Sequence, residues 1–174
     1  MVQEYIITVF SENKVGLLGQ ITSVFTCRNI NIESLTVSQS ALQGVHKFTI
    51  IVSAGSELIE KIVKQIEKKV DVLRALYYTS EEVVQQEIAL YKVVRSSNIE
   101  KLVREHNVRI LEICDEYIII EKTGHKEETQ ALFEILRPLG VEQFVRSGKV
   151  AIVKAEHELL SEYVELMKNY RAGK

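Results

Sequence analysis

The sequence contains few of the residues on which several classes of protein depend. Its 174 residues include two cysteines, one proline and eight glycines. Cys27 and Cys114 stand far apart and form no Cys-x-x-Cys pair, so a disulfide scaffold and a zinc or thiol-redox site are disfavoured. We expect both to be small buried thiols. The scarcity of glycine and proline predicts regular elements joined by short turns.

An excess of charge of one sign is also lacking. Lys and Arg number 22 and Asp and Glu number 24, which gives a formal net charge of −2. Proteins that bind nucleic acid through its phosphates carry a basic excess, which is missing here. Nucleic acid is therefore not an expected partner.

The chain has no apolar run near the roughly 20 residues that span a bilayer. The first ten residues, MVQEYIITVF, carry Glu4 and lack the basic stretch and long apolar segment of a secretory signal. We therefore expect no membrane partner and a cytoplasmic location.

Catalytic patterns are scarce as well. The four histidines are widely spread, and no His-Glu-x-x-His pair, Gly-x-Ser-x-Gly elbow or glycine-rich phosphate loop occurs. The sequence predicts no catalytic residue and no metal site. Catalytic groups can still converge from distant positions, so an enzyme on this scaffold stays an open alternative that would show turnover without any partner.

What the chain does contain is a regular order of elements. At about 150 residues per domain, the length permits one medium domain or two small ones. The first part predicts strand, helix, strand, strand, helix, strand, with a hairpin loop at Gly44 and a helix cap at Ser56. The expected strands are residues 3–10, 31–38, 45–53 and 70–79, and the helices follow the SENKVG turn and Ser56. This βαββαβ order is the ferredoxin-like motif.

The remaining residues repeat that order less clearly. The expected strands are 85–95, 108–114, 117–123 and 141–153, with helices at 97–106, 126–136 and around 159–167. The predicted fold class is α+β, with two tandem ferredoxin-like βαββαβ domains at 1–80 and 81–174. Each would have a four-stranded antiparallel sheet with two helices on one face. A partner domain or a second copy is the natural cover for the other face.

The segment from Asn13 to Leu18 is the best candidate for a binding site. It leads from the first strand directly into the first helix, whose N-terminal N–H groups and partial positive charge suit a carboxylate. Gly16 would let a ligand approach the backbone closely, and Asn13 can cap the helix or accept a hydrogen bond from an ammonium. From the residues alone, an ordinary capped turn is the favoured interpretation, and a ligand site stays open as the alternative.

A second pair of amides stands at the start of the second expected strand. Asn29 fits the left-handed residue that ends a helix. Asn31 could supply a further polar partner for an amino-acid zwitterion, although its spacing alone does not establish that role.

Several segments together resemble a known family. Residues 9–18 (VFSENKVGLL) and 28–37 (RNINIESLTV) are similar to the N-terminal ACT domain of the regulatory small subunit of acetohydroxyacid synthase, also called acetolactate synthase. The later segments VDVLR, EIAL and FVRSGKVA, which begin at Val70, Glu87 and Phe144, resemble further parts of the same family in the same order. The loop at 38–43 lacks the proline and acidic residue often found there.

The resemblance implies a fold, a partner and an effector. Members of this family have no catalytic site, bind and activate a large catalytic subunit, and confer feedback inhibition by valine, in some cases by leucine or isoleucine. Thiamine diphosphate, magnesium and FAD belong to the large subunit. Two ACT domains pair into a homodimer with the amino acid at their interface. The matching ligand residues are Asn13, Lys14, Val15, Gly16, Leu17 and Leu18 of one chain with Asn31 and Ile32 of the other.

Two other functions remain as alternatives. The serious one is an ACT-domain regulator that binds an amino acid for another metabolic enzyme. A transcription regulator would need a helix-turn-helix segment and a basic face, for which the sequence gives no sign.

Overall fold

The computed structural model describes residues 2–96, 99, 102–103 and 105–154. These residues form two compact units, one built from residues 2–84 together with 151–154 and the other from Gln85 to Val150. The helix predicted around 159–167 lies outside the described residues.

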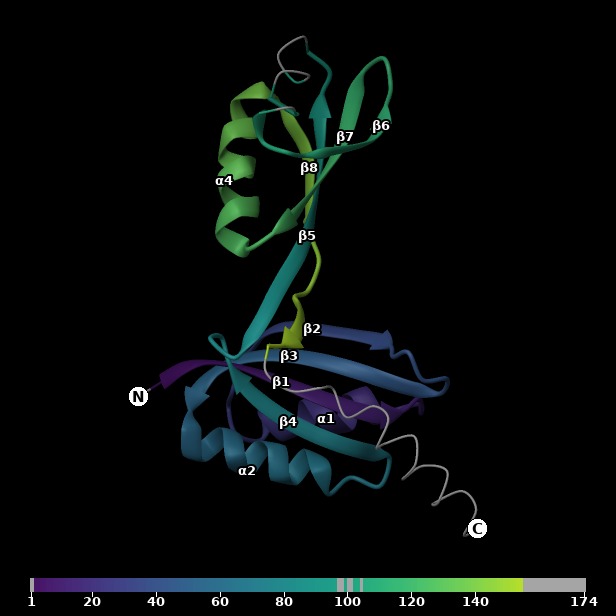
Figure 1. Ribbon diagram of the computed structural model, residues 1–174, viewed down its shortest axis with the longest axis vertical. Coiled ribbons are helices and arrows are strands. Elements are labelled where there is room, and N and C mark those ends of the chain that lie inside the picture. Colours follow the sequence, from purple (N-terminus) through teal and green to yellow (C-terminus); the bar gives the residue numbers. More distant parts are fainter. Residues whose placement is uncertain (1, 97–98, 100–101, 104, 155–174) are drawn as a thin grey trace. The chain divides into compact units, whose positions relative to one another are not determined.

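The first unit has the predicted ferredoxin-like order (Figure 1). Its elements are β1 (Val2–Glu12), α1 (Leu17–Thr26), β2 (Ile32–Gln39), β3 (Val45–Gly55), α2 (Ser56–Glu67) and β4 (Val72–Thr79). The four strands form an antiparallel sheet in the order β2-β3-β1-β4, which leaves β2 and β4 at its edges. Both helices lie on one face of this sheet.

The first core lies between that face and the two helices. Every second residue of β1 and β3 points into it, including Ile7, Val9, Ile50 and Val52, which are all fully buried. α2 contributes Ile59, Ile62, Val63 and Ile66 at helical spacing. The cap predicted at Ser56 is wrong, because Gly55 occupies the N-cap and no side chain caps the helix.

The opposite, outer face of the first sheet carries its own apolar cluster. Ile6 of β1 and Ile51 of β3 are fully buried there. The residues packed around them are Tyr78, Val83, Ala151 and Val153. Val83, Ala151 and Val153 come from the range 81–174 that was predicted as the second domain, so residues of the same chain cover this part of the face.

The second unit repeats the same strand order. Its elements are β5 (Val83–Val94), which begins in the first unit, β6 (Arg109–Ile113), β7 (Tyr117–Gly124), α4 (Lys126–Leu136), a 3₁₀ turn (Arg137–Leu139) and β8 (Val141–Arg146). The strand β9 (Val150–Val153) starts at the last residue of this unit and otherwise belongs to the first. The order β6-β7-β5-β8 matches that of the first sheet, but β9 also pairs with β5. The second unit thus has the four predicted strands, and β9 adds a fifth strand to the same sheet at the start of β5. Of the helix predicted at 97–106, the described residues Ile99, Leu102, Val103 and Glu105 are helical.

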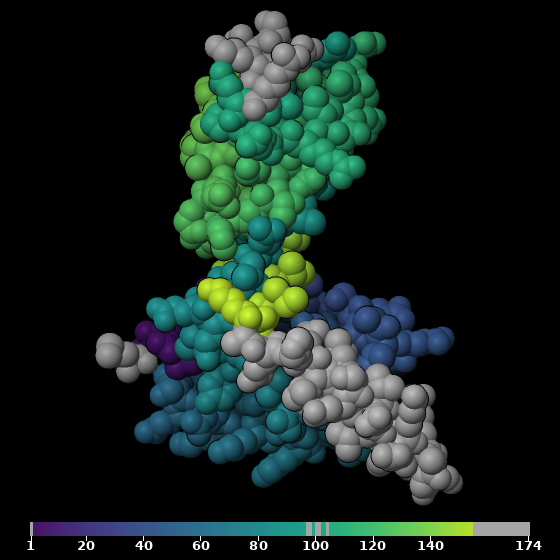
Figure 2. All heavy atoms as spheres, in the orientation of Figure 1, coloured from purple at the N-terminus to yellow at the C-terminus, as the bar shows by residue number. Residues whose placement is uncertain are grey.

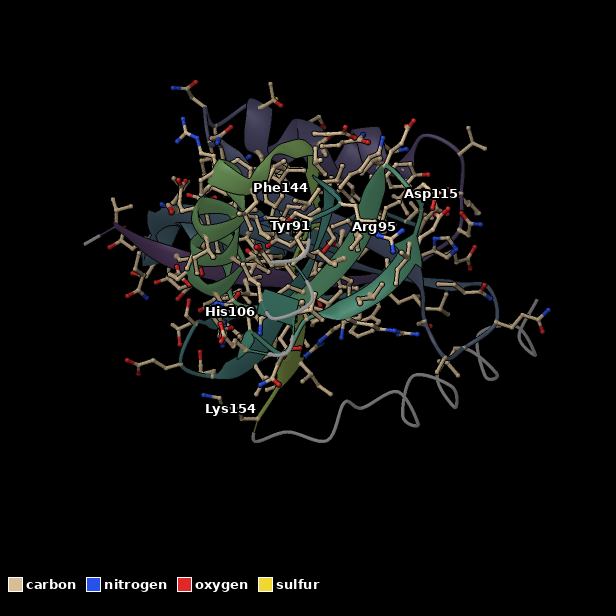
Figure 3. The ribbon with its side chains drawn as sticks, turned by 90° about the horizontal axis from the view of Figure 1, so that it is seen from above. Tyr91, Arg95, His106, Asp115, Phe144 and Lys154 are labelled. Carbon is tan, nitrogen blue, oxygen red and sulfur yellow. The ribbon has the colours of Figure 1, made fainter. Side chains whose placement is uncertain are left out.

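The second core lies between this sheet and its helices. Tyr91 is fully buried and its ring packs against Phe144, with ring centroids 5.1 Å apart (Figure 3). The Tyr91 hydroxyl donates to the carbonyl of Thr129 at 2.6 Å. Burial raises the pKa of Tyr91 to about 12. The hydrogen bond satisfies the polar end of a side chain that otherwise fills an apolar core.

The prediction of two buried thiols is wrong. Cys27, just after α1, is exposed, and Cys114, between β6 and β7, is partly exposed. Among the described residues, no helix is long and apolar enough to cross a membrane.

Candidate functional site

The turn between β1 and α1 is held in a defined conformation by backbone geometry. The Asn13 N–H donates to the carbonyl of Gly44 at 3.3 Å, which ties the turn to the β2–β3 hairpin. Gly16 occupies the helix N-cap with φ 84° and ψ −11°, in the left-handed region that favours glycine. Nothing lies within 4 Å of a Cβ built at this position. Gly16 is thus required by its conformation and leaves the space beside it open.

The first turn of α1 offers backbone donors to a ligand. Leu17 N–H donates to the Lys14 carbonyl at 3.3 Å, and Gln20 N–H donates to the Gly16 carbonyl at 3.1 Å. No side chain caps the helix and its first turn contains no acidic residue. The N–H groups of Leu18 and Gly19 are therefore the donors left for an anion at this end.

Lys14 is engaged by carboxylates of its own chain. Its ammonium lies 2.6 Å from Asp71 Oδ1 and 3.4 Å from Glu12 Oε2. The hydrogen bond with Asp71, followed by its charge and by Glu12, raises the pKa of Lys14. Lys14 therefore fastens the turn to the residue before β4, and its charge is already balanced before any ligand arrives.

The side chains of the turn divide into exposed and buried ones. Asn13 is exposed, Val15 is fully exposed, and Leu18 is 46% exposed. Leu17 is 2% exposed and belongs to the first core. Val15 and Leu18 can therefore contact an apolar ligand group, whereas Leu17 holds the helix in place through its side chain.

Asn31 and Ile32 lie at the other end of the sheet. Asn31 is exposed just before β2, and Ile32 is partly buried against the first core. Along β3, Glu12 is opposite Val45 and Ile32 is opposite Val52. Seven residues of extended strand separate these positions, which amounts to about 24 Å. A single chain therefore does not bring Asn31 to the Asn13 turn.

Two residues of this region escaped the sequence analysis. Gly19 carries one of the remaining donors, and a glycine in the third position of a helix, where it weakens the helix, is the signal that could have found it. Asp71 binds Lys14 from 57 residues away in the sequence, and no local pattern predicts that contact. Asn29 adopts the expected left-handed conformation, with φ 54°.

Comparisons with known proteins match both units. Residues 7–74 match the family model described as an AHAS (acetohydroxyacid synthase) small subunit-like ACT domain, and residues 86–155 match the model described as the small subunit of acetolactate synthase. The acetolactate synthase small subunit of Bacillus subtilis is 32% identical over 161 residues, covering 90% of this chain and 94% of the relative. The chain belongs to the acetolactate synthase small subunit family.

Further members of the small subunit family agree. The probable small subunit of Archaeoglobus fulgidus is 30% identical over 87% of this chain and 97% of its own length. The crystal structure of the small subunit from Thermotoga maritima superposes with a TM-score of 0.81 at 30% identity, covering 89% of this chain and 99% of that one. The family resemblance and the tandem ferredoxin-like fold predicted from the sequence are confirmed.

Proposed function

We propose that this chain is the non-catalytic regulatory subunit of an acetolactate synthase in branched-chain amino-acid biosynthesis. It binds and activates the large catalytic subunit and makes it sensitive to feedback inhibition by valine. The observation that carries this proposal is the match to acetolactate synthase small subunits over nine tenths of the chain. Thiamine diphosphate, magnesium and FAD would then belong to the large subunit, and the predicted cytoplasmic location stays a prediction.

The proposed valine site needs two copies of the chain. Asn13 and Asn31 lie at opposite ends of one sheet, so one site can contain both only if they come from different chains. Among the described strands β2 pairs only with β3, which leaves an edge for a second copy. If the two β2 edges pair antiparallel about a twofold axis, the Asn31 end of one sheet meets the Asn13 end of the other.

The residues of this site would have distinct roles. The N–H groups of Leu18 and Gly19 bind the α-carboxylate of valine at the start of α1. Asn13 and, from the second copy, Asn31 accept hydrogen bonds from its ammonium group. Val15 and Leu18 with Ile32 of the second copy enclose its side chain. Burying a side chain of this size contributes about 1.5 to 3 kcal/mol, so the site would discriminate valine from leucine and isoleucine only modestly.

Inhibition requires that valine distinguish between two arrangements of the complex. It must bind the inhibited arrangement more tightly than the active one, and couplings between distant sites are typically about 1 to 3 kcal/mol. Because the ligand lies between two chains, the interface of the two ACT units is the element whose arrangement it can bias.

Mixing two variants tests the shared site directly. Asn13→Ala and Asn31→Ala should each abolish valine binding, measured by calorimetry on the full chain. When the two variants are mixed and allowed to exchange subunits, a mixed dimer has one intact site and one doubly altered site. Random exchange should therefore restore about a quarter of all sites. Mixing that restores no binding would contradict a site shared between chains.

An assay with the catalytic subunit separates this function from its alternative. If the chain regulates another amino-acid enzyme, calorimetry still detects amino-acid binding while acetolactate formation by the large subunit is unchanged. If the chain activates the large subunit but valine, leucine and isoleucine do not inhibit the complex, the proposed partner is supported and the proposed effector is contradicted.

A further inference from the structure

The residues that follow the second unit return to the sheet of the first. β9 packs Ala151 and Val153 against Ile6 and Ile51, on the face opposite the helices (Figure 1). Val83, at the start of β5, joins the same cluster and is 4% exposed. In Figure 2 the yellow atoms of this segment lie against the first unit.

Hydrogen bonds fasten this segment at several points. The Lys154 N–H donates to the Glu82 carbonyl at 2.9 Å, and the Lys154 ammonium donates to the Glu81 carbonyl at 2.8 Å. The Lys47 ammonium of β3 donates to the Ala151 carbonyl at 3.5 Å. The segment is thus bonded both to the chain before β5 and to the sheet that it covers.

The side chains of the segment alternate as those of a strand covering a surface should. Ala151 and Val153 pack against the sheet, whereas Val150 and Ile152 are 55% and 60% exposed. One face of β9 therefore packs against the sheet, and the other face is exposed. Ile152 and Val153 therefore suit a matched comparison of variants, because they are adjacent in sequence and their side chains point in opposite directions.

We propose that residues 151–154 are a strap that closes the Ile6–Ile51 patch of the outer face, so that this patch is not a docking surface for another chain. Exposed apolar sheet faces are sites of protein association, and a segment of the same chain, held at high effective concentration, outcompetes a separate partner. A partner of the first unit must then bind outside this patch. The strap also makes the exposed surface of the ACT unit depend on residues encoded after the second unit.

Cysteine labelling of the full chain tests the strap without unfolding it. Cys27 and Cys114 are first replaced by Ser, because neither is buried. Ile51→Cys then places a thiol beneath the strap, and Ile50→Cys places one on the opposite face, beneath the helices; both positions are fully buried. Their rates of reaction with a thiol reagent report how often each cover opens.

Weakening the strap should expose only the face beneath it. Val153→Ala removes two methyl groups from the packed side of β9 and should speed labelling of the Ile51→Cys variant by about tenfold, with labelling of the Ile50→Cys variant unchanged. Ile152→Ala should change neither rate. The proposal is overturned if Val153→Ala leaves the thiol at position 51 protected, or if the thiols at positions 50 and 51 accelerate together, because then the strap is not a separate cover.

Sedimentation of a harsher pair of variants tests the uncovered face. Val153→Asp should form larger species than the wild-type chain as the apolar patch becomes available, while Ile152→Asp should keep the wild-type size. If Val153→Asp makes the thiol of the Ile51→Cys variant reactive and yet the protein keeps the wild-type size, the claim that the strap blocks association is overturned. These readouts use neither valine nor the catalytic subunit, so their failure and that of the proposed function are distinguishable.

Discussion

At the scale of single residues, backbone conformation and charge balance decide what the turn after β1 can do. Gly16 leaves space for a ligand because it lacks a side chain, and its positive φ restricts which residues can replace it. Lys14 is neutralised by Asp71 and Glu12, so it supports the turn and leaves a ligand carboxylate to the backbone N–H groups. The proposed ligand would therefore be held by N–H groups more than by charged side chains.

Gly16→Ala should destabilise the chain through its backbone. An L residue at a φ of 84° costs about 1 to 2 kcal/mol of unfolding free energy, although an added Cβ meets no other atom. The matched control is Gly55→Ala, where φ is −81° and the space around the Cβ is also open. Urea unfolding should show a lower unfolding free energy for Gly16→Ala and no such loss for Gly55→Ala. Equal effects at the two positions would contradict the role given to φ.

Lys14→Met should lower stability in a pH-dependent way. The pKa of Lys14 is raised in the folded chain, so its stabilising contribution is fully present below the ordinary lysine pKa of 10.5 and is lost as pH rises through the folded value. Urea unfolding should show that the difference in unfolding free energy between Lys14→Met and wild type is smaller at strongly alkaline pH than at neutral pH. A difference that stays constant above that pKa would show that the lost stability comes from packing.

At the scale of elements, a buried ion pair joins the segments of the second unit that resemble the family. Arg146 of β8 lies 2.6 Å from the Glu87 carboxylate of β5, and the Glu87 side chain is only 4% exposed. Thr129 of α4 donates to the same carboxylate at 2.6 Å. Next to this pair, the Ser147 N–H donates to the Ile88 carbonyl at 2.8 Å. The charge pair thus joins β5 to the end of β8, and the hydroxyl of Thr129 links that pair to α4 through hydrogen bonds.

Breaking this pair on one side should be costly. Arg146→Met leaves the Glu87 carboxylate buried without its counter-charge, which should lower the unfolding free energy by about 3 kcal/mol. The double variant Glu87→Gln with Arg146→Met should recover part of that loss. Lys92→Met is the control, since the Lys92–Glu142 pair is partly exposed and should contribute less than about 1 kcal/mol. A double variant as unstable as the single one would contradict the account.

A chain that ends at Ser80, the predicted boundary of the first domain, should be less stable than the first unit of the full chain. It keeps β1 to β4 but loses Val83, Ala151 and Val153, so the Ile6–Ile51 patch becomes exposed. We expect a lower melting temperature and stronger binding of a hydrophobic dye than in the full chain. Ending the chain instead at Lys154 should restore both properties, and a Ser80 chain with full-chain behaviour would contradict the role of β9.

At the scale of the whole molecule, local patterns predict the order of elements but not the contacts between distant ones. Periodicity predicts both ferredoxin-like units, and α4 has the predicted bounds, Lys126 to Leu136. The return of Val153 to Ile6 and the Lys14–Asp71 pair depend on long-range packing, which leaves no mark on neighbouring residues. The same holds for the distance between Asn13 and Asn31, which only the strand register reveals.

The central claim is that this chain regulates an acetolactate synthase through an amino acid bound between two copies. The most direct measurement is the rate of acetolactate formation by a purified catalytic subunit, with and without this chain, over a range of valine concentrations. The chain alone should form no acetolactate, its addition should raise the rate, and valine should lower that rate in the wild-type complex but not with Asn13→Ala. A rate unaffected by the chain, or an Asn13→Ala complex that valine still inhibits fully, would contradict the account.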